Sequence, residues 1–257
     1  MPKNPGDKRH SDGHYRSLRK EKAGETRSPR RQSPQSYNAH WLTTTPTVGT
    51  ATAAETLHDF YGFPEQLYQL SYAAPGSLTL AEQVAKHLHE AGLAVHPDAG
   101  RGLDHGAWEP LMLMYPAAKI PVTQLSLQPA LGAAYHLRLG QALAPLRENV
   151  LIIGSGSATH NLGAFSRDRF STGFDAPPTG WAQAFDNWLQ ATLLSGDLDA
   201  LLDYRQHAPF ALKSHPSEEH LLPLFVALGA AGKGARSHQL HASFTYGVLS
   251  MASYCFD

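Results

Sequence analysis

The sequence predicts a single α/β domain in which layers of strands and helices surround one core. Segments with strand character alternate along the chain with segments of helical periodicity. The chain has 257 residues, of which 42% are hydrophobic, so it can bury a core of the size that one large domain requires. It contains no internal repeat. These three observations favour a layered α/β architecture.

The first predicted helix covers residues 78–93, where apolar side chains recur at steps of three and four. Pro110 should limit a helix over 106–115, because proline lacks the backbone donor that a helix needs beyond its first turn. The remaining elements follow in order: a strand over 121–127, a helix over 132–148, a buried strand over 150–154, an amphipathic helix over 181–194, and closing strands over 244–248 and 251–256.

A further helix should begin near Ser217, whose hydroxyl is suited to cap the exposed backbone N–H groups of a helix start. Glu218 and Glu219 would then lie in the first turn, where the helix dipole favours acidic side chains. His220 follows these two carboxylates and precedes an apolar run. The sequence therefore predicts an acidic helix start that carries an imidazole.

Composition narrows the function classes. The formal net charge is −1, so bulk electrostatics give no reason to expect a nucleic-acid or membrane partner. Cys255 is the single cysteine, which excludes an internal disulfide and a zinc site of the CxxC type. No apolar stretch approaches the roughly 20 residues of a membrane span. We expect a soluble cytoplasmic protein.

The near-zero net charge conceals two parts of opposite sign. Residues 1–36 hold ten Lys or Arg against four Asp or Glu, whereas the rest holds 11 against 18. We expect residues 1–37 to form a basic, disordered tail. The tail has few aromatic residues and lacks a folded basic face, which argues against nucleic-acid binding.

Residues 150–162, VLIIGSGSATHNL, join a buried strand to a glycine–serine loop. A dinucleotide fingerprint would need a third glycine, but Thr159 occupies that position, and no phosphate-binding lysine follows. A phosphate site is therefore disfavoured. The loop instead displays His160 at the carboxyl edge of a sheet, where open α/β sheets place their ligands.

Other histidines occur in comparable loop settings. The chain holds 15 histidines, and each one alone could be a packed structural residue. Several of them, spread over about 180 residues, are what a mononuclear metal site assembled from different sheet edges would require. The candidates are His40, His58, His105, His160 and His220.

These residues lie within a series of motifs that resembles a known family. The motifs are AHW at 39–41, HDFYGFP at 58–64, YAAPGS at 72–77, GLDHGAWEPLMLMYP at 102–116, IPVTQLSLQ at 120–128, GSGSATHNL at 154–162, EEHLLPL at 218–224 and TYGVLSM at 245–251. Together they are similar to the class III extradiol ring-cleavage dioxygenases, in the DOPA-dioxygenase-like branch, over residues 38–257.

The resemblance implies one catalytic domain with a mixed central sheet flanked by helices. It also implies one divalent metal, Fe(II) for activity or Zn(II) as isolated, and a catechol such as DOPA that is opened with O2. His40 and His220 match metal-ligand positions, and His160 matches a position that is a further ligand or the catalytic acid/base. His105 matches a histidine that contacts substrate or oxygen, and His58 lies in a motif without an assigned role.

The chain departs from the family pattern at its start. The family opens with a GHGSP-like motif whose histidine is another ligand, and only His10 and His14 stand near that place. Residues 31–38 also lack the β-branched run of a central strand. We therefore expect the tail to lie outside the domain, and activity to be impaired unless His10 or His14 supplies the missing ligand. The alternatives are a metal-dependent hydrolase or an inactive binding protein on the same scaffold.

Overall fold

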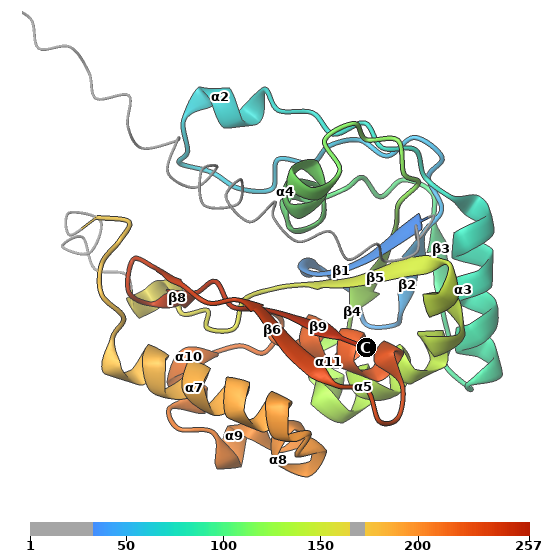
Figure 1. Cartoon of the computed structure of the whole chain (residues 1–257). Coiled ribbons are helices and arrows are strands. Elements are labelled where there is room, and N and C mark those ends of the chain that lie inside the picture. Colours follow the sequence, from blue (N-terminus) through green and yellow to red (C-terminus); the bar gives the residue numbers. More distant parts are fainter. Residues whose placement is uncertain (1–32, 165–172) are drawn as a thin grey trace, which may run out of the picture. The chain divides into compact units, whose positions relative to one another are not determined.

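A five-stranded mixed sheet forms the centre of the structure (Figure 1). The structure, a computed structural model, describes residues 33–164 and 173–257, with side chains from residue 39 onward. His10, His14 and most of the predicted tail lie outside the described residues. The strands run in the order β3 (His96–Asp98), β2 (Thr47–Gly49), β4 (Thr123–Leu127), β1 (Ser33–Leu42) and β5 (Val150–Ser155).

The strand directions set the position of the site. β1 is parallel to both β4 and β5, whereas β2 is parallel to β3 and antiparallel to β4. The carboxyl ends of β1, β4 and β5 therefore meet at one edge of the sheet. This arrangement confirms the predicted α/β fold with a mixed central sheet.

β1 extends into residues 33–37, which the composition assigns to the tail. Residues 33–38 carry no β-branched run, yet they pair along their length with β5, and residues 35–37 also pair with β4. Hydrogen bonding to strands on both sides thus overrides weak local propensity. The lack of a β-branched run therefore does not exclude a central strand before the AHW motif.

The two faces of the sheet bury separate hydrophobic cores. Ile152 packs against the larger core, to which α3 (Leu78–Glu90), α5 (Gly132–Leu143) and α11 (Leu222–Ala231) contribute. Its neighbour Ile153 packs against the smaller core around Trp108 of α4 (His105–Met114). This alternation along β5 follows from the period of two in a strand. Because both faces are covered, β4 is buried at every residue.

Three helices match the predictions closely, namely α3, α5 and α7 (Gly180–Ser195). α5 ends before Pro145, which lies in a 3₁₀ helix over Ala144–Glu148. α4 differs from the prediction, because it continues through Pro110. Ala107, Trp108 and Leu111 are at most 1% exposed, so burial of this face outweighs the hydrogen bond that the proline removes.

The helix predicted to start at Ser217 begins later, at Leu222. Ser217 caps no helix, because its hydroxyl donates to Glu219 Oε1 at 2.7 Å. Pro223 instead occupies the first helical turn, where its missing N–H is not needed. His220 consequently lies in the segment before α11 and is not held in a helical turn.

The C-terminal strands form two small sheets and do not join the central one, as β6 pairs with β9 and β7 with β8. None of the described helices has the length and apolar character needed to cross a membrane. The remaining elements are β6 (Ser237–His241), β7 (Phe244–Thr245), β8 (Leu249–Ser250), β9 (Ser253–Phe256), α2 (Glu65–Tyr68), α8 (Leu198–Leu202), α9 (Tyr204–His207), α10 (Ala211–Ser214), and 3₁₀ helices at Pro129–Leu131 and Leu162–Ala164.

Candidate functional site

Four of the five histidines singled out from the sequence meet at the carboxyl edge of the sheet. His40 lies near the end of β1, His105 begins α4, His160 follows β5 and His220 precedes α11. The ring centroid of His40 lies 3.9 Å from that of His105 and 5.2 Å from that of His220. The rings of His160 and His220 are stacked at 3.4 Å. Residues far apart in the chain thus form one cluster of imidazoles.

His58 has a different role from these four. Its Nε2 lies 2.9 Å from the carbonyl oxygen of Leu70, and its ring contacts Phe60, Tyr68 and Trp108. Such contacts are those of a packed aromatic residue. His58 therefore supports the loop over residues 57–70 and does not reach the imidazole cluster through any contact that the structure describes.

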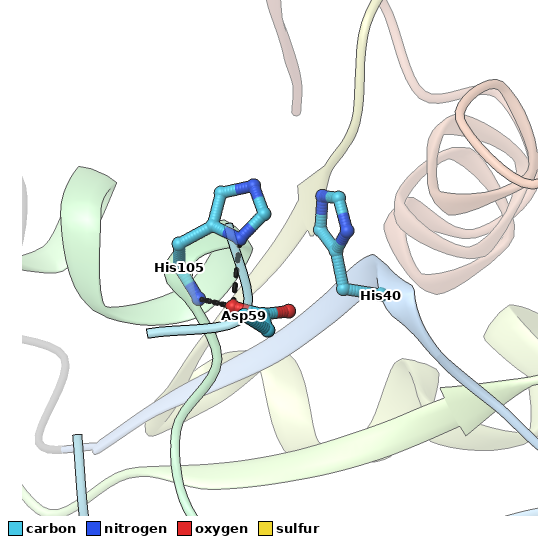
Figure 2. Close-up of side chains that lie close together, drawn as sticks. All are labelled: His40, Asp59 and His105. Atoms are coloured by element: carbon cyan, nitrogen blue, oxygen red, sulfur yellow. Dashed lines mark hydrogen bonds and ion pairs between the residues drawn. The ribbon is translucent and has the colours of Figure 1, made fainter. Parts of the chain in front are cut away.

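Asp59, next to His58, orients His105 (Figure 2). Its Oδ1 accepts the backbone N–H of His105 at 3.0 Å and lies 2.7 Å from the ring Nδ1. The carboxylate lies at the start of α4, where the helix dipole favours a negative charge. Hydrogen bonds from His105 lower the pKa of Asp59 despite partial burial.

Asp104, the acid next to His105 in the chain, has a different role. Asp104 is fully buried, and its Oδ2 accepts from Arg101 Nη2 at 2.7 Å and from Gln124 Nε2 at 3.0 Å. Arg101 also lies over the ring of Trp41, at 5.3 Å from the ring centroid. Arg101 thus connects Trp41 and Asp104, the chain neighbours of His40 and His105.

The glycines of the 154–160 loop permit close approach to α11. A Cβ on Gly154 would lie 2.3 Å from the carbonyl oxygen of Pro223, and one on Gly156 would lie 2.1 Å from that of His220. Neither glycine has a positive φ. These glycines therefore leave room for another backbone.

Backbone hydrogen bonds dock this loop on the segment before α11. Ser157 N–H donates to the carbonyl of His220 and His160 N–H donates to that of Ser214, both at 2.9 Å. The fully buried His215 adds a side-chain contact, with its Nε2 2.9 Å from the Ala158 carbonyl oxygen. These contacts fix the register in which His160 stacks on His220.

A second set of hydrogen bonds ties the loop to α7. Thr159 Oγ1 donates to the Val248 carbonyl at 2.9 Å and accepts the Ser250 N–H at 2.7 Å. Ser250 Oγ donates in turn to Asp186 Oδ1 at 2.6 Å. Burial raises the pKa of Asp186. The residue adjacent to His160 is therefore anchored through two elements remote in sequence.

The cluster favours neutral imidazoles. Burial is the largest cause that lowers the pKa of His40, His160 and His220, and neighbouring imidazoles lower it further. The pKa of His220 falls to about 3, although Glu219, 3.2 Å from its Nδ1, acts in the opposite direction. Neutral imidazole is the form that binds a divalent metal.

Two overlapping sets of residues could hold such an ion. The donor atoms of His40, Asp59 and His105 all lie within 4.8 Å of one another. The set expected from the sequence shares His40 and adds His160 and His220, whose rings are stacked beside it. Sequence reasoning did not single out Asp59, although its place beside His58 in the HDFYGFP motif was a signal.

Comparison with known proteins shows which family and which relatives this chain is similar to. Residues 37–257 match the family described as the catalytic LigB subunit of aromatic ring-opening dioxygenase. The chain is 47% identical over 226 residues to the 4,5-DOPA dioxygenase extradiol of Beta vulgaris, with coverage of 85% of this chain and 80% of the relative. It is 37% identical over 206 residues to the protein of the same name from Escherichia coli K12, covering 79% and 73%.

A solved structure is similar in fold. The crystal structure of an uncharacterized protein from Escherichia coli K12 superposes with a TM-score of 0.73 at 33% sequence identity. The match covers 88% of this chain and 86% of the other. The similarity therefore extends over most of the described residues.

Proposed function

Because the chain belongs to the family of the catalytic LigB subunit of aromatic ring-opening dioxygenases, we propose that it opens the ring of a catechol such as DOPA with O2. Cleavage would occur beside the diol and yield a muconic semialdehyde-type product. The observation that carries the proposal is the cluster of four imidazoles at the sheet edge, in a chain that matches this family over residues 37–257.

One divalent metal would be held by His40, His160 and His220, with Fe(II) as the active ion and Zn(II) as the ion found on isolation. The chemistry of these donors fits such an ion, because burial keeps all three imidazoles neutral. When bound, a ferrous ion would supply the one-electron chemistry that overcomes the spin barrier between dioxygen and a catechol. A reducing compartment such as the cytoplasm suits this ion.

The chain's own residues would carry the protons. A catechol has two hydroxyl protons to lose, and a neutral imidazole can accept one and later return it. His105, oriented by Asp59, and His160, docked by its loop, are the two candidates. His160 could serve as a metal ligand or as the acid/base, whereas His105 would act as an acid/base beside the metal.

Fe(II) should be added to the protein under anaerobic conditions, and oxygen uptake then measured with DOPA and with simple catechols. We expect uptake from the parent protein and none from His40→Ala or His220→Ala. His89→Ala, at an exposed position of α3, is the control and should behave like the parent. Turnover retained in either site variant would refute the site assignment, and bound zinc without oxygen uptake would favour the hydrolase alternative.

A further inference from the structure

The interaction between Asp59 and His105 has a consequence for which ring nitrogen of His105 is available for chemistry. A single carboxylate oxygen, Asp59 Oδ1, receives two N–H groups of the same residue, at 3.0 Å from the backbone nitrogen and 2.7 Å from Nδ1. This two-point attachment fixes both the start of α4 and the orientation of the ring. A carboxylate only accepts hydrogen bonds, so the ring proton must lie on Nδ1.

With the proton on Nδ1, the lone pair of neutral His105 is on Nε2. Figure 2 shows this second nitrogen on the side of the ring away from Asp59, with the ring of His40 beside it. The two ring centroids are 3.9 Å apart. Phe60 packs edge-on against His105 at 5.6 Å and supports the ring from another direction. The free nitrogen thus borders the proposed metal ligands.

We propose that Asp59 is a positioning residue that holds His105 as the Nδ1–H tautomer, so that Nε2 accepts a proton from a catechol hydroxyl. The inference rests on the proposed function for the identity of the proton donor. It follows the general pattern in which a carboxylate orients a histidine base and stabilises the imidazolium that forms. In the step, the catechol O–H bond breaks and an Nε2–H bond forms, leaving a catecholate beside an imidazolium paired with Asp59.

Asp59 could instead be a third metal ligand with His40 and His105, because their donor atoms lie close together. The hydrogen bonds argue against that role. Asp59 Oδ1 already receives two donors, and the Nδ1 that faces it carries a proton in place of a free lone pair. A metal between these two groups would have to displace that proton.

The tautomer can be measured directly in the metal-free protein, by long-range ¹H–¹⁵N NMR of the imidazole rings. The signal of His105 is assigned by its loss in His105→Gln. We expect a protonated Nδ1 in the parent protein and loss of that preference in Asp59→Ala. A parent ring protonated on Nε2 would overturn the proposal, whether or not the protein cleaves catechols.

Kinetics and metal titration separate the two roles of Asp59. In the Fe(II)-loaded protein, Asp59→Ala should lower kcat about 100-fold and leave KM within about threefold, because the substrate still binds beside a misoriented base. Zn(II) affinity should stay within about threefold of the parent value. Asp59→Asn, which keeps an acceptor for the backbone N–H, provides a folded variant if the alanine variant is unstable, and should also lose at least tenfold in kcat.

Asp98→Ala is the matched control. Asp98 Oδ1 also accepts two backbone N–H groups, from Gly100 and Arg101. Both donors belong to the turn that directly follows Asp98 in the chain. This variant should keep the parent kcat within about twofold and leave the His105 tautomer unchanged. Zn(II) affinity at least tenfold weaker in both Asp59 variants would show that Asp59 supports metal binding and would overturn the proposal, and an unchanged kcat would refute it as well.

Discussion

Replacing Gly156 by alanine should push apart the two segments that carry His160 and His220. The added Cβ would lie 2.1 Å from the His220 carbonyl oxygen, about 1.3 Å inside the 3.4 Å at which ordinary contact begins. The obstacle is main chain and cannot rotate away. The same carbonyl accepts the Ser157 N–H. Overpacking and the lost hydrogen bond together should lower the free energy of unfolding by roughly 2–4 kcal/mol.

The same substitution should also lower turnover. His160 is four residues from the new methyl group and stacks on His220 at 3.4 Å. A displacement of about 1 Å in a reacting group is enough to lower turnover about 100-fold. Urea unfolding gives the first quantity, and oxygen uptake by the Fe(II)-loaded protein gives the second.

Gly180→Ala is the control for adding a methyl group. Gly180 is the first residue of α7, and no atom lies within 4 Å of a Cβ built there. Alanine should leave turnover unchanged and raise the free energy of unfolding by up to about 1 kcal/mol. If Gly156→Ala unfolded within about 0.5 kcal/mol of the parent protein and took up oxygen at the parent rate, the close-approach explanation would be wrong.

Two further predictions concern buried titratable groups. Burial lowers the pKa of His215 to about 4, below its ordinary 6.5, so the unfolded chain binds a proton that the folded chain does not. The free energy of unfolding should therefore fall by on the order of 3 kcal/mol between pH 7 and pH 4, and urea titrations of the parent and His215→Gln should show a shallower fall in the variant. Burial raises the pKa of Asp186, so its charge opposes folding above that pKa. Asp186→Asn keeps an acceptor for Ser250 and should raise the Tm at pH 7.5 by a few degrees, whereas a lower Tm would show that the charge itself is required.

The sequence predicts the parts of the site that follow directly from strand ends. His160 comes after an apolar strand, and parallel strands end at a common edge, so its place could be inferred from residues 150–162 alone. His220 was harder to place, because Ser217, Glu218 and Glu219 have the composition of a helix start. The structure starts the helix at Leu222, since Ser217 donates to Glu219 and leaves no cap for a turn there.

The partner of His105 could not be read from local sequence. Asp104 is adjacent in the chain, but it is buried with Arg101 and Gln124. Asp59, 46 residues away, reaches the ring because the 57–70 loop packs over α4, where Trp108 Nε1 donates to the Leu57 carbonyl at 2.9 Å. The pairing of Asp59 with His105 depends on tertiary packing. A single sequence contains no periodic pattern that predicts such a long-range contact.

The order of the central sheet also constrains how this protein folds. β1 lies between β4 and β5, yet its partners are synthesised much later, since Tyr37 pairs with Leu125, 88 residues on, and Asn38 pairs with Ser155, 117 residues on. These long loops must close before most native contacts can form. The entropic cost of closing them makes folding slow. A growing chain would therefore carry β1 with both edges unpaired until β4 leaves the ribosome, and with one edge unpaired until β5 follows. Productive folding should depend on keeping these edges from pairing with other chains, so refolding yield should fall as protein concentration rises.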